Sequence, residues 1–186
     1  MTLRRPGNTY RLLGLITILL LTIQPLFAQM EFVENKGQWH SLVNFKGDFK
    51  TGSFYLENNG YGVLMHHPDD LHALAEQSHG HGVKAGETIP PITLRSFVYQ
   101  MRFVDAQPGK ALPEKPLSTY NNYFLGNDPA KWAGQCRIFQ AVTYRNIYPG
   151  IDIRYYSDGG RLKYDFIVQP GANIARIRMK YEGLPE

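Results

Sequence analysis

The sequence of 186 residues contains a single cysteine, Cys136, and therefore cannot form an internal disulfide. It also lacks the patterns on which several enzyme classes depend. We find no glycine-rich phosphate loop, no nucleotide fingerprint, no Gly-x-Ser-x-Gly elbow, and no pair of histidines four apart around a glutamate. No fixed-period repeat is present either. These absences leave the chain without a recognisable reaction centre, and we expect no catalytic residue and no cofactor.

Long apolar runs are almost absent as well. The one continuous run, residues 12–23, is shorter than the ~20 residues that a membrane-spanning helix needs. It follows Arg4, Arg5 and Arg11 and precedes Gln24 and Pro25, and Ala28 offers a small residue for cleavage before Gln29. This is the pattern of a secretory signal peptide. We predict that residues 1–28 are removed, that the protein is secreted or placed at the cell surface, and that no membrane span remains.

The predicted mature chain has almost no net charge. The formal net charge of +4 falls to +1 once the three arginines of the leader are removed, because the leader carries no acid. A mature chain so close to neutral has no strong electrostatic attraction to nucleic acid. We therefore expect a protein or glycan at the cell surface as the partner, and no nucleic acid.

Long helical patterns are missing too. Instead, apolar and polar residues alternate with a period of two through much of the chain. Apolar residues alternate with charged ones over residues 151–156, 161–168 and 176–181, three strands in succession separated by turn signals. Asn58, Asn59 and Gly60 predict a hairpin over residues 53–66. The pattern predicts an all-β fold, an antiparallel β-sandwich of about nine short strands formed by residues 29–186.

Two segments interrupt this alternation. Residues 68–93 are rich in histidine, glycine and proline and are predicted to be a mobile insertion between two strands, with a short helix over residues 69–77 capped by Asp69. Residues 105–118 contain three prolines and are predicted to be a connector. The next strands are expected at residues 95–104 and 138–144.

Several short segments of the sequence, taken together, resemble a known family. They are the segments 32–39, 123–129 with Trp132, 144–152, 160–166 and 170–172. In combination they are similar to the N-terminal β-rich domain of large secreted bacterial proteins, which carry β-propeller repeats of the SBBP type or PKD and immunoglobulin-like modules. Many of those proteins end in a sorting signal for type IX secretion, the export route associated with gliding motility.

The resemblance implies a domain that heads a larger exported protein, and it supplies no catalytic residues. In that family the domain continues through more strands and the protein through further modules, whereas this sequence stops at Glu186. We therefore expect the chain to be a fragment, with a domain that is incomplete at its C-terminal end.

Histidines are the first candidates for chemistry. Five of the six lie between residues 66 and 81, and neutral imidazoles bind zinc, copper or nickel. The candidate metal ligands are His66, His67, His79 and His81. Because the segment is rich in glycine, it would not hold such ligands in place, and a solvated low-complexity insertion is the preferred interpretation.

Aromatic residues are the second group of candidates. Four of them could form a binding face for a sugar or a protein: Trp39, Trp132, Tyr148 and Tyr156. Core packing is the alternative for each. Asp152, Asp158 and Asp165 could bind calcium or act in acid–base chemistry, but turn formation and cross-strand ion pairs account for them better. Cys136 is interpreted as a small buried residue rather than a nucleophile.

The leading functional hypothesis is a non-catalytic interaction or scaffolding module of an exported protein, with adhesion as one form of that role. A carbohydrate-binding module is the second hypothesis, resting on the aromatic residues. A secreted hydrolase that uses the acids or a histidine-bound metal is the third.

Overall fold

The computed structural model describes residues 29–78 and 91–183, and these form an all-β fold with one α-helix. The expected all-β class is confirmed. The described strands and helices are β1 (Phe32–Glu34), β2 (Val43–Phe49), β3 (Gly52–Glu57), β4 (Gly60–His66), α2 (Pro68–Ser78), β5 (Ser96–Phe103), β6 (Lys110–Tyr123), β7 (Ala133–Tyr148), β8 (Ile151–Asp158), β9 (Arg161–Val168) and β10 (Met179–Glu182), with two short 3-10 helices at Pro129–Lys131 and Ile174–Arg176.

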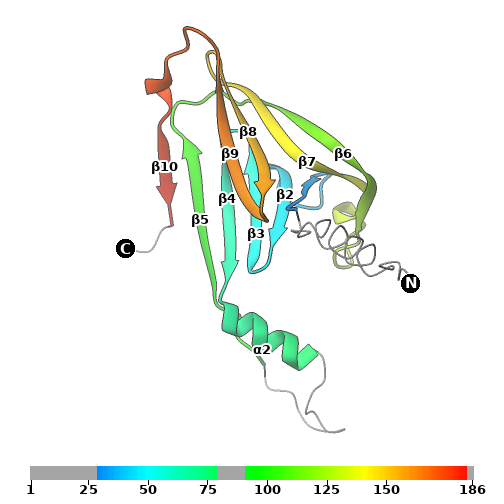
Figure 1. Ribbon diagram of the computed structural model, residues 1–186. Coiled ribbons are helices and arrows are strands. Elements are labelled where there is room, and N and C mark those ends of the chain that lie inside the picture. The colour runs from blue at the N-terminus through cyan, green and yellow to red at the C-terminus, as the bar shows by residue number, and fades with distance from the viewer. Residues whose placement is uncertain (1–28, 79–90, 184–186) are drawn as a thin grey trace, which may run out of the picture.

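All ten strands belong to one antiparallel sheet in the order β10-β5-β4-β3-β2-β1-β7-β8-β9, and β6 pairs with β7. Strand β7 is the branch point. β6 lies along one edge of β7, and β1 and β8 pair with successive parts of the other edge, at Ile138–Phe139 and at Ala141–Tyr148 respectively. Because both branches leave the same edge, the twisted sheet curls and its two parts face each other (Figure 1).

The core lies between these two parts of the sheet. Tyr61 of β4 meets Tyr155 of β8 with ring centroids 6.2 Å apart, and Phe103 of β5 meets Phe166 of β9 at 5.6 Å. The expected sandwich therefore takes the form of a single sheet packed on itself. The predicted inward sets are confirmed where the layers overlap, because Ile151, Ile153 and Tyr155 are fully buried.

The predicted hairpin over residues 53–66 is confirmed. β3 and β4 pair from Gly52↔Met65 to Glu57↔Gly60, with Asn58 and Asn59 in the turn. The short helix expected inside the insertion is also present as α2, between β4 and β5. It begins at Pro68, so Asp69 lies in its first turn and is not its N-cap as expected. Residues 79–90, where the rest of the expected mobile segment falls, lie outside the described residues, as does the predicted signal peptide at residues 1–28.

The expectation of a connector at residues 105–118 is wrong, because most of it belongs to β6. Proline cannot donate to a sheet ladder and is normally confined to edge strands. β6 is such an edge, since its only partner among the described residues is β7. Pro113 and Pro116 lie in β6 opposite Val142 and Phe139, so the prolines mark the edge of a sheet and not a break in it.

The last predicted strand is present but differently placed. The alternation over residues 176–181 suggested a third strand following β8 and β9. Instead a 3-10 helix at Ile174–Arg176 carries the chain across the molecule, and β10 pairs with β5 from Met179↔Phe103 to Glu182↔Gln100. Hydropathy alternation gives the faces of a strand but does not say which neighbour it joins.

Candidate functional site

A loop fixed by several side-chain hydrogen bonds joins β1 to β2 and begins at Asn35. The Asn35 side chain organises it: its amide nitrogen donates to the carbonyl oxygens of Val43 at 2.7 Å and His40 at 3.0 Å. Its amide oxygen accepts from the backbone N–H groups of Gly37 at 3.0 Å and Trp39 at 3.2 Å. One side chain thus replaces the backbone hydrogen bonds that a strand would have supplied, and the loop is held in one conformation.

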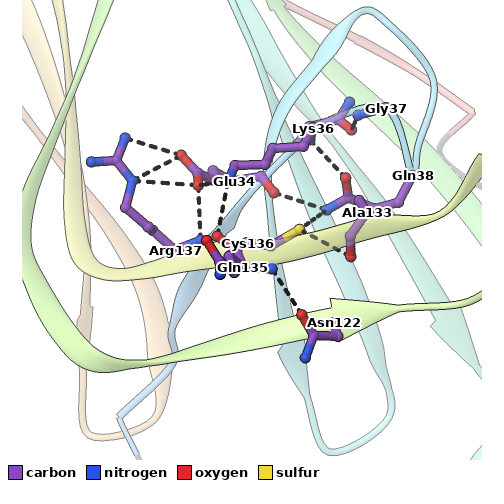
Figure 2. Close-up of polar contacts among 10 residues, drawn as sticks. Glu34, Lys36, Gly37, Gln38, Asn122, Ala133, Gln135, Cys136 and Arg137 are labelled. Carbon is purple, nitrogen blue, oxygen red and sulfur yellow. Dashed lines mark hydrogen bonds and ion pairs between the residues drawn. The ribbon is translucent and has the colours of Figure 1, made fainter.

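Gln38 fixes the same loop to the sheet from inside. Its side chain is buried, and its amide nitrogen donates to the Glu34 carbonyl oxygen at 2.8 Å and lies 3.4 Å from the Cys136 sulfur. Its amide oxygen accepts from the Lys36 N–H at 2.6 Å, and Lys36 Nζ donates to the Gln135 carbonyl oxygen at 2.9 Å. Figure 2 shows these contacts joining the loop to β7.

An ion pair between Arg137 and Glu34 adds to these contacts on the solvent-exposed side of the loop. The Arg137 N–H donates to Glu34 Oε1 at 2.9 Å, and its guanidinium reaches Glu34 Oε2 at 3.2 Å (Figure 2). Burial alone would raise the pKa of Glu34, but the hydrogen bonds from the Arg137 backbone and guanidinium outweigh it and lower that pKa below its ordinary value of 4.5. The carboxylate is therefore charged at neutral pH and holds β1 to β7.

Cys136 belongs to this network as a packing residue. Its side chain is fully buried beside Val33, Ala133 and Ile138, and burial raises the pKa of its thiol. A buried, protonated thiol is a poor nucleophile. The interpretation of Cys136 as a small buried residue is confirmed.

The loop positions Trp39 over the outer face of the sheet, the face turned away from the core. The indole packs edge-on against Tyr123 of β6, with centroids 5.1 Å apart, and Lys46 Nζ lies 5.7 Å from the indole centroid. On its remaining side Trp39 lines a hollow of about 460 Å³, which we call the outer hollow. Trp39 is the one aromatic candidate from the sequence that lines it.

The outer hollow is mostly apolar. Leu42 and Val98 are each 56% exposed, although large aliphatic side chains on a solvent-facing sheet are usually rarer than polar ones. Tyr55 of β3 and Leu64 of β4 complete the wall. The floor is Gly62, at which an added Cβ would meet only Gln100 Cγ, at 3.9 Å. The absence of a side chain at this position creates the depression.

Polar groups gather on one side of the hollow. Glu57 and Arg102 form an ion pair of 3.3 Å across β3 and β5, and the Arg102 guanidinium also donates to Gln100 Oε1 at 3.2 Å. His40 lies on the loop, where its Nδ1 accepts from the Leu42 N–H at 3.3 Å. An apolar floor with a partly paired polar rim can take up an apolar group and orient it by hydrogen bonds.

The other three aromatic candidates lie elsewhere. Trp132 is 45% exposed in the β6–β7 connection, where its indole N–H donates to the Gly126 carbonyl oxygen at 3.2 Å. Tyr148 is buried, with its hydroxyl donating to the Val104 carbonyl oxygen at 2.7 Å, so its ring offers no face to a ligand. Tyr156 lies on β8 with the Arg154 guanidinium carbon 5.2 Å from its ring centroid. The structure does not gather the four into one face.

The histidine candidates do not form a site among the described residues. His66 Nδ1 is 2.8 Å from Ser96 Oγ, and His67 Nδ1 is 3.8 Å from Asp69. His79 and His81 lie outside the described residues. Over residues 29–78 and 91–183, no group of three or more histidine, cysteine or acidic side chains is placed to hold a metal ion.

The three aspartates take part in local contacts. Asp152 accepts from the Asn146 N–H at 2.7 Å and lies 3.8 Å from Arg145 Nε. Asp158 pairs with Lys163, and Asp165 lies opposite Arg154 in the β8–β9 ladder.

Sequence reasoning missed most of the hollow. The alternation over residues 95–104 puts Phe97, Tyr99, Met101 and Phe103 on one face of the strand, and the burial of Met101 and Phe103 shows that this face is turned inward. The same alternation puts Val98 outward, and Tyr55 and Leu64 face outward on the neighbouring strands. Apolar residues at these outward-facing positions could have indicated a binding surface. Only the strand register, however, brings them together with Trp39.

Comparison with known proteins gives one match. A family model described as "Domain of unknown function (DUF7948)" matches residues 32–186. No curated protein and no solved structure matches the chain.

Proposed function

The chain belongs to the DUF7948 family of domains of unknown function, and from its own geometry we propose that it is a non-catalytic interaction module that binds another protein through the outer hollow. The observation that carries the proposal is the hollow itself. It is an exposed apolar depression of about 460 Å³ on a sheet face, bordered by a loop whose conformation is fixed by Asn35 and Gln38.

Protein interfaces are organised in this way. A few apolar or aromatic anchors fill depressions at the centre, and polar groups surround them and exclude water. Burying one leucine-sized anchor contributes about 1.5–3 kcal/mol. The Asn35 and Gln38 hydrogen bonds hold Trp39 in position before a partner arrives, which lowers the entropic cost of binding.

The polar groups at the hollow favour recognition over catalysis. Glu57, the acid among the described residues that line it, is ion-paired with Arg102, and His40 Nδ1 is occupied by a backbone N–H. Neither group lies in a closed, water-excluding pocket of the kind that acid–base catalysis uses.

We also propose that the module acts outside the cytoplasm, at the cell surface or in the medium. Support comes from the leader pattern of residues 1–28 and from the resemblance to N-terminal domains of large secreted bacterial proteins that use type IX sorting. Among the described residues, no helix is long and apolar enough to cross a membrane.

Gly62→Leu tests the proposal, because the side chain would fill the hollow without a backbone clash. Peptides selected from a displayed random library against the purified protein should share an apolar or aromatic anchor residue. They should lose at least about tenfold in affinity for Gly62→Leu, since an anchor that cannot enter forfeits more than 1.4 kcal/mol. Isothermal titration calorimetry provides the affinities.

Gly134→Leu is the matched control. Gly134 lies on β7, outside the outer hollow, and an added Cβ there meets only Asn122 Oδ1, at 3.4 Å. It should bind the selected peptides like the wild type. Equal affinity for Gly62→Leu and the wild type would contradict the proposal. Quenching of Trp39 fluorescence by a soluble glycan, in the absence of any selected peptide, would favour a carbohydrate-binding module instead.

A further inference from the structure

Three strands of the described sheet have a free edge: β6, β9 and β10. β6 is protected against pairing with other chains. Pro113 and Pro116 remove two donors from it, and Lys115 has a left-handed backbone with φ of 51°, which interrupts the regular edge. Such devices are how natural sheets prevent unwanted strand addition.

β9 carries none of these devices. It contains no proline, and its ladder with β8 is unbroken from Ile151↔Val168 to Asp158↔Arg161. The Gln169 N–H donates to the Gly150 carbonyl oxygen at the end of this ladder. Because ladder bonds alternate along an antiparallel pair, the even-numbered residues 162–168 direct their N–H and C=O groups away from β8, toward the free edge.

The two layers of the curled sheet do not end together. β4 faces β8 and β5 faces β9, as the Tyr61–Tyr155 and Phe103–Phe166 contacts show. β10 extends one strand further, beyond the edge of β9 (Figure 1). Its inward residues Met179 and Tyr181 consequently remain 41% and 43% exposed. The layer that contains β9 reaches β10 through Tyr164, whose hydroxyl lies 3.7 Å from Met179 Sδ, and it leaves much of the Met179 and Tyr181 side chains uncovered.

The interior below the β9 edge has room for side chains. A cavity of about 290 Å³ lies between the layers, and Leu162 and Tyr164 of β9 and Met65 and Tyr99 of the opposite layer are among its lining residues. The outward face of β9 carries Arg161 and Lys163 at one end and Asp165 toward the other. A strand placed beside β9 would meet apolar surface on its inner side and a defined order of charges on its outer side.

We propose that β9 accepts an extended segment of a partner protein as an added strand. The segment has apolar residues at alternate positions, which lie over Met179 and Tyr181 and enter the cavity. It has acidic residues opposite Arg161 and Lys163 and a basic residue opposite Asp165. Strand addition of this kind draws its affinity from the backbone and its specificity from the alternate side chains. This surface is distinct from the outer hollow, and the inference goes beyond the proposed function.

The test uses a fluorescent peptide with the sequence Val-Thr-Val-Lys-Val-Glu-Val-Glu. In an antiparallel register it places the stated charges opposite Arg161, Lys163 and Asp165, and its first residue lies opposite Val168. We expect saturable binding to the wild-type protein by fluorescence anisotropy. Val168→Pro should weaken it at least about tenfold, because the proline removes an edge donor and its ring blocks the edge, while the ladder with β8 is kept. Val168→Thr keeps the donor and is the matched control.

Two further comparisons complete the test. The charge-reversed peptide Val-Thr-Val-Glu-Val-Lys-Val-Lys should bind the wild type more weakly, and Arg161→Glu should narrow the difference in affinity between the two peptides. Gly62→Leu should leave peptide binding unchanged, so failure here and failure of the proposed function are distinguishable. Absence of saturable binding up to about 1 mM peptide, or equal affinity of Val168→Pro and the wild type, would overturn the inference.

Discussion

At the scale of single residues, Tyr155 is the clearest departure from an optimised core. Its hydroxyl is buried and, among the described residues, has no hydrogen-bond partner. The rings of Tyr61, Tyr144 and Tyr164 surround it at centroid distances of 5.9 to 6.2 Å. Burial, together with the neighbouring tyrosines, raises the pKa of Tyr155 well above its ordinary value of 10.0. The group is therefore neutral in the folded protein even in alkaline solution.

Replacing Tyr155 with phenylalanine should stabilise the protein, because it removes an unsatisfied polar group and keeps the ring. We expect a gain of about 1 kcal/mol in the free energy of unfolding at pH 7. Above about pH 10 the tyrosine of the unfolded chain ionises and that of the folded chain does not, so wild-type stability falls as pH rises. Tyr155→Phe should lose stability less steeply over this range, as measured by urea denaturation at successive pH values.

Tyr144→Phe is the control, since the Tyr144 hydroxyl accepts a hydrogen bond from Asn44 Nδ2 at 3.3 Å and its loss should destabilise. A Tyr155→Phe protein less stable than the wild type at pH 7 would mean that the Tyr155 hydroxyl has a partner.

At the scale of single residues, the sequence identified one residue of the site and missed others. Trp39 could be identified as a candidate because large aromatic residues are frequent in binding sites. Tyr148 could not be distinguished from Trp39 by sequence, because its burial depends on two distant segments, whose Val104 and Arg178 carbonyl oxygens accept from its hydroxyl. Gly62 gave no local signal, since its role is to leave space that other strands surround.

At the scale of elements, an ion pair between Asp70 of α2 and Arg95 ties the helix to the segment that leads into β5. None of its residues is buried. The Arg95 guanidinium donates to Asp70 at 2.7 and 2.9 Å, and the Arg95 N–H donates at 2.8 Å. These hydrogen bonds hold the pKa of Asp70 well below its ordinary value of 3.8. The attachment should therefore persist as pH falls through 4 and weaken only in stronger acid, where the lowered pKa is reached.

Asp70→Asn should detach α2 while leaving the sheet intact. We expect faster amide hydrogen exchange across Pro68–Ser78 with an unchanged melting transition, because the helix contributes nothing to the core. Asp69→Asn is the control, since the Asp69 side chain is exposed and 3.8 Å from its nearest ion-pair partner, His67. Unchanged exchange in Asp70→Asn would show that other contacts hold the helix.

The elements also show which sequence patterns carry information. Alternation predicted β3, β4, β5, β8 and β9 because each has one face in the core. It failed for β6, where the prolines suggested a connector, because only the pairing with β7 reveals that this segment is an edge strand. It likewise gave the existence of β10 but not its pairing with β5, since chain order and spatial order differ there.

At the scale of the whole molecule, the class of fold could be predicted and its topology could not. Period-two patterns and the absence of helical ones are local properties, and they sufficed for an all-β antiparallel domain. The curl of one sheet onto itself depends on β1 and β8 sharing an edge of β7, which no local pattern encodes.

The proposed export makes a prediction about the complete chain. Protein recovered from the medium or the cell surface of an expressing bacterium should begin at Gln29, because cleavage after Ala28 removes the leader. Intact-mass spectrometry measures this directly. Ala28→Lys is the control that should block cleavage at this position. A secreted protein that retains residues 1–28 would contradict the prediction.

The central place of β1 has a consequence for how the molecule assembles. β2 to β5 each pair with the strand that neighbours them in the chain, and α2 lies in the connection between β4 and β5. β1 is three residues long. It pairs with the nearby β2, but its other partner is distant in the chain, since the Glu34 carboxylate accepts from the N–H of Arg137 across a separation of 103 residues. Closing so long a loop is slow and gains little until the final contacts form. The pairing of β1 with β7, which joins the two parts of the sheet, can therefore form only after the ribosome has synthesised β7.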